Sequence, residues 1–147
     1  MRRIVPLLAG LVALAVTAAA GATPPTPVTI MVVADFSGPV PHGVFTASAP
    51  LCPSGTFVTE PIAGGGGRVA FAFVGRQHFS CAASGGTFTL QFHPQVHPPD
   101  FADSGPWAAL GGTGAYDGLR GAGDFLLLGF ISPTTAVASF VGEVHFD

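Results

Sequence analysis

The sequence contains no lysine and carries little charge of either sign. Charged residues make up 9% of its 147 residues, with five arginines against eight aspartates and glutamates. Nucleic-acid binding needs a dense basic surface, while Walker-A phosphate loops and Schiff-base catalysis each need a lysine. The composition therefore argues against all three of these classes of function.

Segments long enough to form a helix are also scarce. The chain has 21 glycines and 14 prolines, and beyond residue 22 the longest segment free of both spans residues 28–37. That segment is rich in β-branched residues, which favours a strand over a helix. The 13 phenylalanines and a hydrophobic content of 48% indicate a folded core rather than a disordered chain. We therefore predict an all-β protein.

Alternation of apolar and polar residues predicts where the strands lie. Phe88, Leu90 and Phe92 share one strand face, opposite threonine and glutamine side chains. We expect strands at residues 28–36, 43–49, 56–60, 68–75, 77–82, 86–93, 107–110, 119–131 and 135–146. So many short strands in one domain are typical of a closed antiparallel barrel or a sandwich. A hairpin loop at Gly64–Gly67 and a proline-rich surface excursion at 93–99 are expected outside the strands.

The first 22 residues have the pattern of a secretory signal peptide. Two arginines follow Met1, residues 4–20 carry no charge, and small residues at positions 20–22 suit cleavage. A retained membrane anchor is the alternative, but Pro6 and Gly10 interrupt the apolar run, which is scarcely long enough to span a bilayer. We therefore expect residues 1–22 to be removed on export. The mature protein is then a secreted single domain, residues 23–147, without a stable membrane anchor.

Two cysteines, Cys52 and Cys81, lie in the mature part of the chain. An even number of cysteines in an exported chain favours a disulfide, and two free buried thiols are the alternative. A metal site built on this pair alone is disfavoured, because zinc sites use closely spaced cysteine pairs.

Residues 124–131 are apolar on both faces of the expected strand. One face of a strand in an antiparallel barrel normally meets water. We therefore expect the outer face of this strand to be covered, either by the N-terminal arm or by another subunit.

Several phenylalanines are expected on the inner face of the barrel. A barrel of eight strands is just wide enough either to fill with side chains or to hold one small ligand. Both outcomes stay open, a solid phenylalanine core and a cavity for a small apolar ligand. In the second case, Gly142 would leave space on its strand. The lining of such a cavity would include Phe71, Phe73, Phe88, Phe92, Phe140 and Val144.

Candidate ligands for a metal ion are few. His93 and His97 have the spacing of a helical histidine pair, and Asp100 and Asp103 lie nearby. Prolines at positions 94, 98 and 99 forbid that helix. We interpret both histidines as surface residues and expect neither a metal ion nor another cofactor.

The tripeptide Asp103-Ser104-Gly105 matches the Asp-Ser/Thr-Gly pattern of aspartic proteases. Such an enzyme needs two carboxylates that share a proton, so the second would have to come from another subunit. The nearest candidate partner segment, 127–129, is close in sequence, and Pro106 would disturb the catalytic turn. A protease is therefore disfavoured.

The most distinctive segment is a glycine-rich stretch in the C-terminal third. A nucleotide-binding glycine loop leads into a helix, but a strand is expected to follow here. A tight turn between two strands fits better, with glycines supplying positive φ and with Tyr116 and Leu119 anchoring the turn on the core. Arg120 is expected to form an ion pair with Asp117 or Asp124.

This stretch carries a family resemblance. The chain reads Trp-x3-Gly-Gly-Thr-Gly-x-Tyr-x2-Leu-Arg-Gly-x-Gly, with Gly111, Gly112, Thr113, Gly114, Tyr116, Arg120 and Gly121 at its centre. The pattern resembles the hallmark turn of dirigent proteins and of the allene oxide cyclase-like barrel superfamily. Small exported actinobacterial proteins share it, together with cysteine- and phenylalanine-containing segments that correspond to 52–56, 79–81 and 84–88 here.

The resemblance implies an eight-stranded antiparallel β-barrel, commonly a trimer, around an apolar cavity. Plant relatives cyclise an epoxide fatty acid or steer the radical coupling of phenols. Their cavity residues do not match this chain position by position, so the resemblance extends to the fold and not to the activity. We therefore expect an antiparallel barrel of eight strands, up to nine, and a homo-oligomer that is a trimer by resemblance.

Two classes of function remain. We favour an exported barrel that binds a small apolar ligand or a partner without catalysis, because the sequence shows no convergent acid–base pair. The alternative is a cyclase or isomerase that acts on a hydrophobic substrate in the same cavity, which needs only a few polar groups. A buried aspartate or glutamate in the cavity would favour catalysis.

Overall fold

The structure is a computed structural model that describes residues 21–66, 71–83, 85–97 and 102–147. In these ranges it contains nine β-strands and one short 3-10 turn, η1 (Gly114–Tyr116). The strands are β1 (Thr26–Asp35), β2 (His42–Ala47), β3 (Ser54–Gly66), β4 (Phe71–Cys81), β5 (Thr87–Phe92), β6 (Gln95–His97), β7 (Ala102–Thr113), β8 (Leu119–Ser132) and β9 (Thr135–Phe146). No helix in the described ranges has the length and apolar character to cross a membrane.

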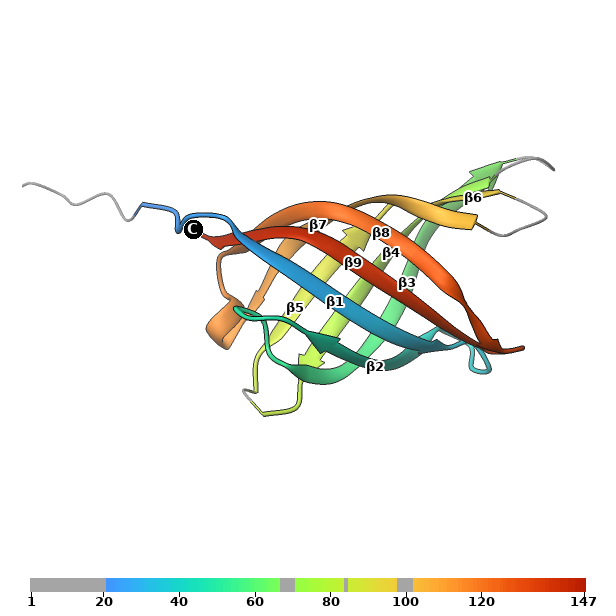
Figure 1. Cartoon of the computed structure of the whole chain (residues 1–147), viewed down its shortest axis with the longest axis horizontal. Coiled ribbons are helices and arrows are strands. Elements are labelled where there is room, and N and C mark those ends of the chain that lie inside the picture. Colours follow the sequence, from blue (N-terminus) through green and yellow to red (C-terminus); the bar gives the residue numbers. More distant parts are fainter. Residues whose placement is uncertain (1–20, 67–70, 84, 98–101) are drawn as a thin grey trace, which may run out of the picture.

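The strands close into an antiparallel eight-stranded barrel with β6 as a short additional strand (Figure 1). Neighbours follow the order β3-β2-β1-β9-β8-β7-β5-β4, and pairing of β3 with β4 closes the barrel. β6 pairs with both β4 and β7 beyond the end of β5. The predicted all-β barrel is therefore confirmed, and the sandwich alternative is excluded.

Several expected strand boundaries are wrong, among them the strand expected at 107–110, which is β7 from Ala102 to Thr113, because this barrel accommodates glycine and proline within its ladders. The expected strands at 68–75 and 77–82 are not separate over residues 71–81, since β4 is continuous from Phe71 to Cys81. Gly64–Gly66 pair with β4 instead of forming a loop, and β3 absorbs Pro61 at a bulge. Residues 95–97 join the ladder as β6. Positions 67–70, which include the start of the expected strand 68–75, and positions 98–99 lie outside the described residues.

The glycine-rich turn fixes Tyr116 and Leu119 in the core, where both side chains are buried. Gly114 and Gly118 adopt φ values of +62° and +73°, a backbone conformation that other residues rarely take. Thr113, the residue before η1, accepts a hydrogen bond from the backbone N–H of Thr87 at 3.2 Å. The turn is thus tied both to the core and to β5.

Arg120 does not pair with an acidic residue of its own turn. Its Nε lies 3.1 Å from Oδ2 of Asp147, so the expected pairing with Asp117 or Asp124 is wrong. The physical reason is the register of β8 and β9, which places Arg120 opposite His145 and brings Asp147 within reach. Both side chains are about half exposed, so the ion pair contributes little to stability.

One end of the barrel is filled by aromatic side chains. Phe79 stacks on Phe88 with ring centroids 4.7 Å apart, and it meets Phe45 and Phe140 edge to face. Stacked and edge-to-face contacts are the arrangements that aromatic rings prefer. All four rings are buried, so this end of the interior is a solid phenylalanine core.

Trp107 fills the space that two glycines leave. A Cβ on Gly142 would lie 2.7 Å from Cζ2 of Trp107, and a Cβ on Gly123 would lie 2.8 Å from its Nε1. The indole N–H donates a hydrogen bond to the carbonyl of Val141 at 3.2 Å. The expectation that Gly142 leaves free cavity space is therefore wrong, because the indole ring occupies that space.

Cys52 and Cys81 form the predicted disulfide. It links the segment before β3 to the last residue of β4, and Cys52 is buried in the core. The bond lies at the end of the barrel that holds the aromatic core, since Phe79 is two residues from Cys81 on the same strand.

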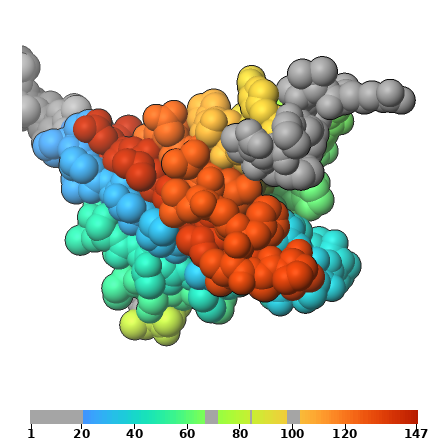
Figure 2. Space-filling view, turned by 45° about the vertical axis from the view of Figure 1, so that its right-hand side comes forward, coloured from blue at the N-terminus to red at the C-terminus, as the bar shows by residue number. Residues whose placement is uncertain are grey.

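The outer face of β8 lies open at the surface, where its orange atoms are visible in Figure 2. Leu126 and Leu128 point outward and are about half exposed. The first described residues lie beside the end of β9, where the N–H of Thr23 donates to the carbonyl of Phe146 at 2.9 Å. The expected cover by the N-terminal arm is therefore wrong for the described residues, and cover by another subunit stays a prediction.

Candidate functional site

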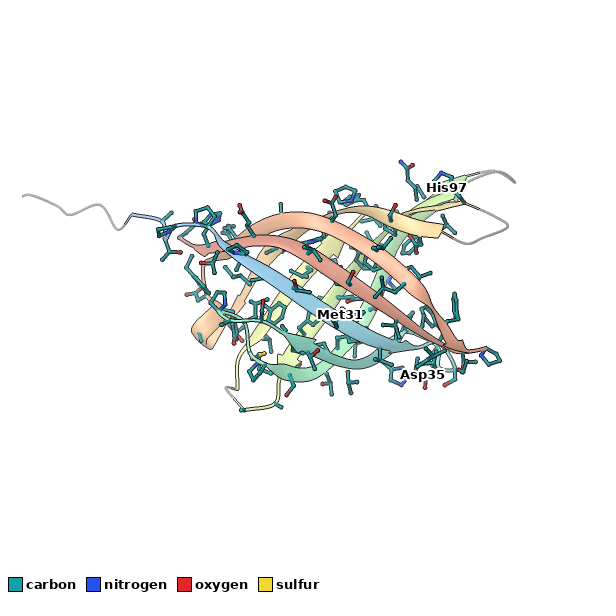
Figure 3. The ribbon with its side chains drawn as sticks, viewed as in Figure 1. Met31, Asp35 and His97 are labelled. Carbon is teal, nitrogen blue, oxygen red and sulfur yellow. A yellow bond between two sulfur atoms is a disulfide. The ribbon has the colours of Figure 1, made fainter. Side chains whose placement is uncertain are left out.

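A pocket of about 230 Å³ occupies the barrel end where β1 finishes and β9 begins. Asp35 and His97, labelled in Figure 3, lie at this end of the barrel. The lining is apolar except for three residues. The apolar lining residues are Ala34, Phe36, Pro41, Phe73, Phe92, Val96, Phe125, Leu127, Phe130, Ala136 and Ala138, and the polar ones are Thr59, Gln77 and Asp103.

The pocket exists because alanines replace large side chains in one layer of the barrel. Ala34 of β1 is directly opposite Ala136 of β9, and Ala138 follows on the same face of β9. Two residues further along that face, Phe140 is fully buried in the aromatic core. The inner face of β9 therefore changes from small to large side chains, and the open space begins where the phenylalanines end.

The residues predicted to line a cavity divide between the pocket and the core. Phe73 and Phe92 line the pocket, while Phe88, Phe140 and Val144 are buried away from it. Phe92 joins the two regions, with its ring centroid 5.8 Å from that of Phe73 and 5.7 Å from that of Phe140. The side chain of Phe71 lies outside the described part of the structure.

Two half-exposed phenylalanines stand at the rim of the pocket. The ring centroids of Phe36 and Phe130 are 6.2 Å apart. Beside them, the N–H of Ser37 donates to Oδ1 of Asp35 at 2.8 Å, and this hydrogen bond holds the pKa of that carboxyl below its ordinary value. The pocket entrance therefore has an apolar rim with one exposed carboxylate next to it.

Three polar side chains reach into the pocket without a hydrogen-bond partner in the described part of the chain. They are Thr59, Gln77 and Asp103, only 7%, 5% and 8% exposed, and the unpaired atoms are Oγ1, Oε1 and Oδ1 respectively. Thr59 and Gln77 are direct neighbours across β3 and β4, while Asp103 projects from β7. A buried oxygen left unpaired typically costs about 1–3 kcal/mol, so these groups favour a ligand that satisfies them.

Asp103 is the one ionisable side chain among the described residues that line the pocket. Burial raises the pKa of its carboxyl to about 6, because the apolar surroundings penalise the charged form. Its side chain lies inside the barrel, where a carboxylate of another subunit could not share its proton. The structure thus removes the geometry that an aspartic protease would need.

The histidines considered as metal ligands lie at the surface. His93 and His97 are exposed, and the Nε2 atom of His93 lies 3.0 Å from the amide nitrogen of Gln91. Within the ranges that the structure describes, no three His, Cys, Asp or Glu side chains gather in a way that could hold a metal ion.

Gln77 and Asp103 could not be assigned to the inner face from the expected strands, because these divide β4 in two and begin β7 at residue 107. Extending the face of Phe71 and Phe73 along a continuous β4 would have placed Gln77 on the inner face, two residues before Phe79. Asp103 belongs to the tripeptide weighed as a protease motif and lies near the histidines weighed as metal ligands, and neither interpretation places it on a strand. Alternation backward from Trp107 along β7 would have placed it on the inner face.

Comparison with protein-family models, with curated proteins and with solved structures gives no match.

Proposed function

We propose that this protein is a non-catalytic binding barrel that takes one compact apolar ligand into the pocket between Ala34, Ala138 and Phe92. The observation that carries the proposal is the pocket itself, about 230 Å³ of space with a largely apolar lining and an apolar rim. Pockets for drug-sized ligands usually measure about 300–1,000 Å³, so the ligand here is smaller than those. Fixed apolar walls favour such a molecule because they remove its surface from water.

Kinship with the allene oxide cyclase-like and dirigent-like barrels is part of the same proposal. It is supported by the glycine-rich turn around Tyr116 together with the eight-stranded antiparallel barrel. The homo-oligomer expected from that resemblance stays a prediction, and native mass spectrometry of the mature protein measures it. The exposed leucines of β8 are the surface on which a second copy would bury apolar area.

We propose export as well, and the Cys52–Cys81 disulfide supports it because such bonds persist in oxidising compartments. Protein recovered from the medium of an expressing bacterial culture is expected to begin at Thr23, with the first 22 residues removed. N-terminal sequencing checks this. Secreted protein that retains Met1 would rule out cleavage.

Filling the pocket is expected to abolish binding without unfolding the barrel. Ala138 is buried and lines the pocket, so Ala138→Leu places three added carbons in the empty space. We expect affinity for 2-phenylethanol, measured by calorimetry, to fall at least about tenfold, while thermal stability stays equal or rises because a void is filled.

Ala108→Leu is the matched control, since Ala108 lies on the outer face of β7 and is exposed. This variant is expected to bind 2-phenylethanol as the natural chain does. Equal loss of affinity in both variants, or no loss in Ala138→Leu, would show that the ligand binds elsewhere.

A cyclase or isomerase is the second candidate function, and the buried carboxyl of Asp103 is the observation that favours it. It ranks second because Asp103 is the one ionisable side chain in the described pocket lining, so no second acid–base group faces it there. A carboxyl whose pKa lies near 6 in an apolar pocket is suited to donate and accept protons near neutral pH. The two candidates differ in the fate of the bound molecule. A binding protein releases it unchanged and an isomerase releases it rearranged, which chromatography of the recovered ligand distinguishes.

A further inference from the structure

The three unpaired atoms in the pocket are all oxygens that accept hydrogen bonds. The carboxylate of Asp103 accepts only, the carbonyl oxygen of Gln77 accepts only, and the hydroxyl of Thr59 can do either. No arginine or histidine belongs to the described pocket lining. Its buried unpaired atoms are thus acceptors with one negative charge, and the described lining holds no positive charge to balance them, the amide N–H groups of Gln77 being neutral donors.

From this arrangement we infer that the ligand is a compact apolar amine, whose ammonium group pairs with Asp103 while its apolar body fills the space beside Ala136 and Ala138. The inference rests on the proposed binding function and specifies its ligand class. An ammonium group carries three N–H donors and no acceptor, so it complements a pocket that presents acceptors. A charged pair formed away from water is stronger than the same pair at the surface.

The same chemistry disfavours fatty acids and other carboxylates. Their negative head group would enter an apolar space that already holds the carboxyl of Asp103, and like charges in such a site repel. A neutral alcohol can donate one hydrogen bond but gains no charge pairing. The expected order of affinity is therefore amine, then alcohol, then carboxylate.

The charged groups on the elements around Asp103 face away from the pocket. On β8, Arg120 pairs with Asp147 and Asp124 is exposed, and His97 of β6 is exposed.

On the wall formed by β3 and β4, the charged side chains bond to one another or to outer polar groups: Glu60 to His78 and Arg76 to Gln91. His93, which follows β5, is exposed beside Gln91. On β1, β2 and β9, Asp35, His42, Glu143 and His145 lie outside the described lining. A pH effect on binding between pH 5 and 8 thus reports on Asp103.

The test compares three ligands that share a phenyl ring on a two-carbon chain and differ in the polar group: phenethylamine, 2-phenylethanol and 3-phenylpropionate. Calorimetry on the mature protein at pH 8 is expected to show phenethylamine binding about tenfold more tightly than the alcohol, with the carboxylate weakest. At pH 5, where Asp103 holds its proton, the preference for the amine should largely disappear. The amine itself stays charged at both pH values, because alkylammonium groups lose their proton only near about pH 10.

Two variants distinguish the effect of Asp103 on amine binding from the effect of negative charge on the protein surface. Asp103→Asn is expected to bring the affinities for amine and alcohol within about threefold of each other at pH 8. Asp124→Asn, which removes an exposed carboxylate from β8, is expected to keep the tenfold preference. The pH comparison on the natural chain needs no variant, so it stands even if a variant folds poorly.

The outcomes distinguish this inference from the proposal beneath it. Binding of the alcohol or the carboxylate as tightly as the amine overturns the amine inference and leaves the binding function standing. A preference for the amine that survives Asp103→Asn or pH 5 also overturns it. Absence of binding by all three ligands overturns the binding function itself.

Discussion

Replacing Asp103 by asparagine is expected to stabilise the protein at pH 8 by on the order of 3 kcal/mol. The carboxyl is 8% exposed and has no partner in the described part of the chain, so its ionisation in the folded state is costly. Asparagine keeps the shape of the side chain and carries no charge. Urea unfolding of both proteins at pH 8 and at pH 4 measures the effect.

The sign of the effect follows from proton binding. The unfolded chain loses the Asp103 proton near pH 3.8, and the folded chain keeps it until about pH 6. Between these values the folded state holds one more proton, so the stability of the natural chain falls as pH rises. This rise in the pKa of Asp103 corresponds to a loss of about 3 kcal/mol in the stability of the folded chain. The loss is present in full above pH 6 and absent below pH 4.

Asp124→Asn is the control, because Asp124 is exposed and pairs through its backbone with β9. Its stability is expected to stay within about 0.5 kcal/mol of the natural chain at both pH values. Equal stability of Asp103→Asn and the natural chain at pH 8 would contradict the assignment of Asp103 as a buried unpaired carboxyl.

Removing the disulfide is expected to produce the largest loss of stability. Cys52 and Cys81 are 29 positions apart in sequence, and closing a loop of that size stabilises a protein by about 3–4 kcal/mol on the chain-entropy model. The free energy of unfolding of the double variant Cys52→Ala/Cys81→Ala should therefore be lower by about that amount. Its unfolding midpoint should lie at a lower urea concentration. Alanine avoids placing a new polar group at buried Cys52.

Reducing the disulfide of the natural chain provides an independent measurement of its contribution to the free energy of unfolding. Chemical denaturation in the presence of a reductant is expected to give the stability of the double variant. A loss below about 1 kcal/mol in both experiments would mean that the unfolded chain gains little freedom when this bond is absent.

The fold could be predicted from the sequence because its signals are local. Alternation along residues 86–93 and 135–146 requires strands, and the glycines around Tyr116 require a tight turn. Two cysteines in a chain that is expected to be exported predict a disulfide between them. The boundaries of β3, β4 and β7 could not be set in this way, because a closed barrel provides each strand with two neighbours that hold glycine and proline in place.

The pocket was harder to predict because it depends on contacts across the barrel. Whether Phe140 or Ala138 faces open space depends on the side chains of strands far away in the sequence, here Ala34 of β1 and Phe92 of β5. Trp107 shows the same dependence, since it fills the space that Gly142 leaves two strands away. Local alternation identifies inward positions and cannot by itself divide them between a core and a pocket.

Methyl NMR of alanine-labelled protein, titrated with phenethylamine at pH 8, tests the central claim most directly. Ala34, Ala136 and Ala138 line the pocket, whereas Ala108 and Ala122 are exposed on the outer surface of the barrel. We predict that the methyl signals of the three pocket alanines shift together along one saturable curve and that the two outer signals stay in place. Shifts confined to the outer alanines, or no saturable shift with phenethylamine, 2-phenylethanol or 3-phenylpropionate, would contradict a ligand site inside this barrel.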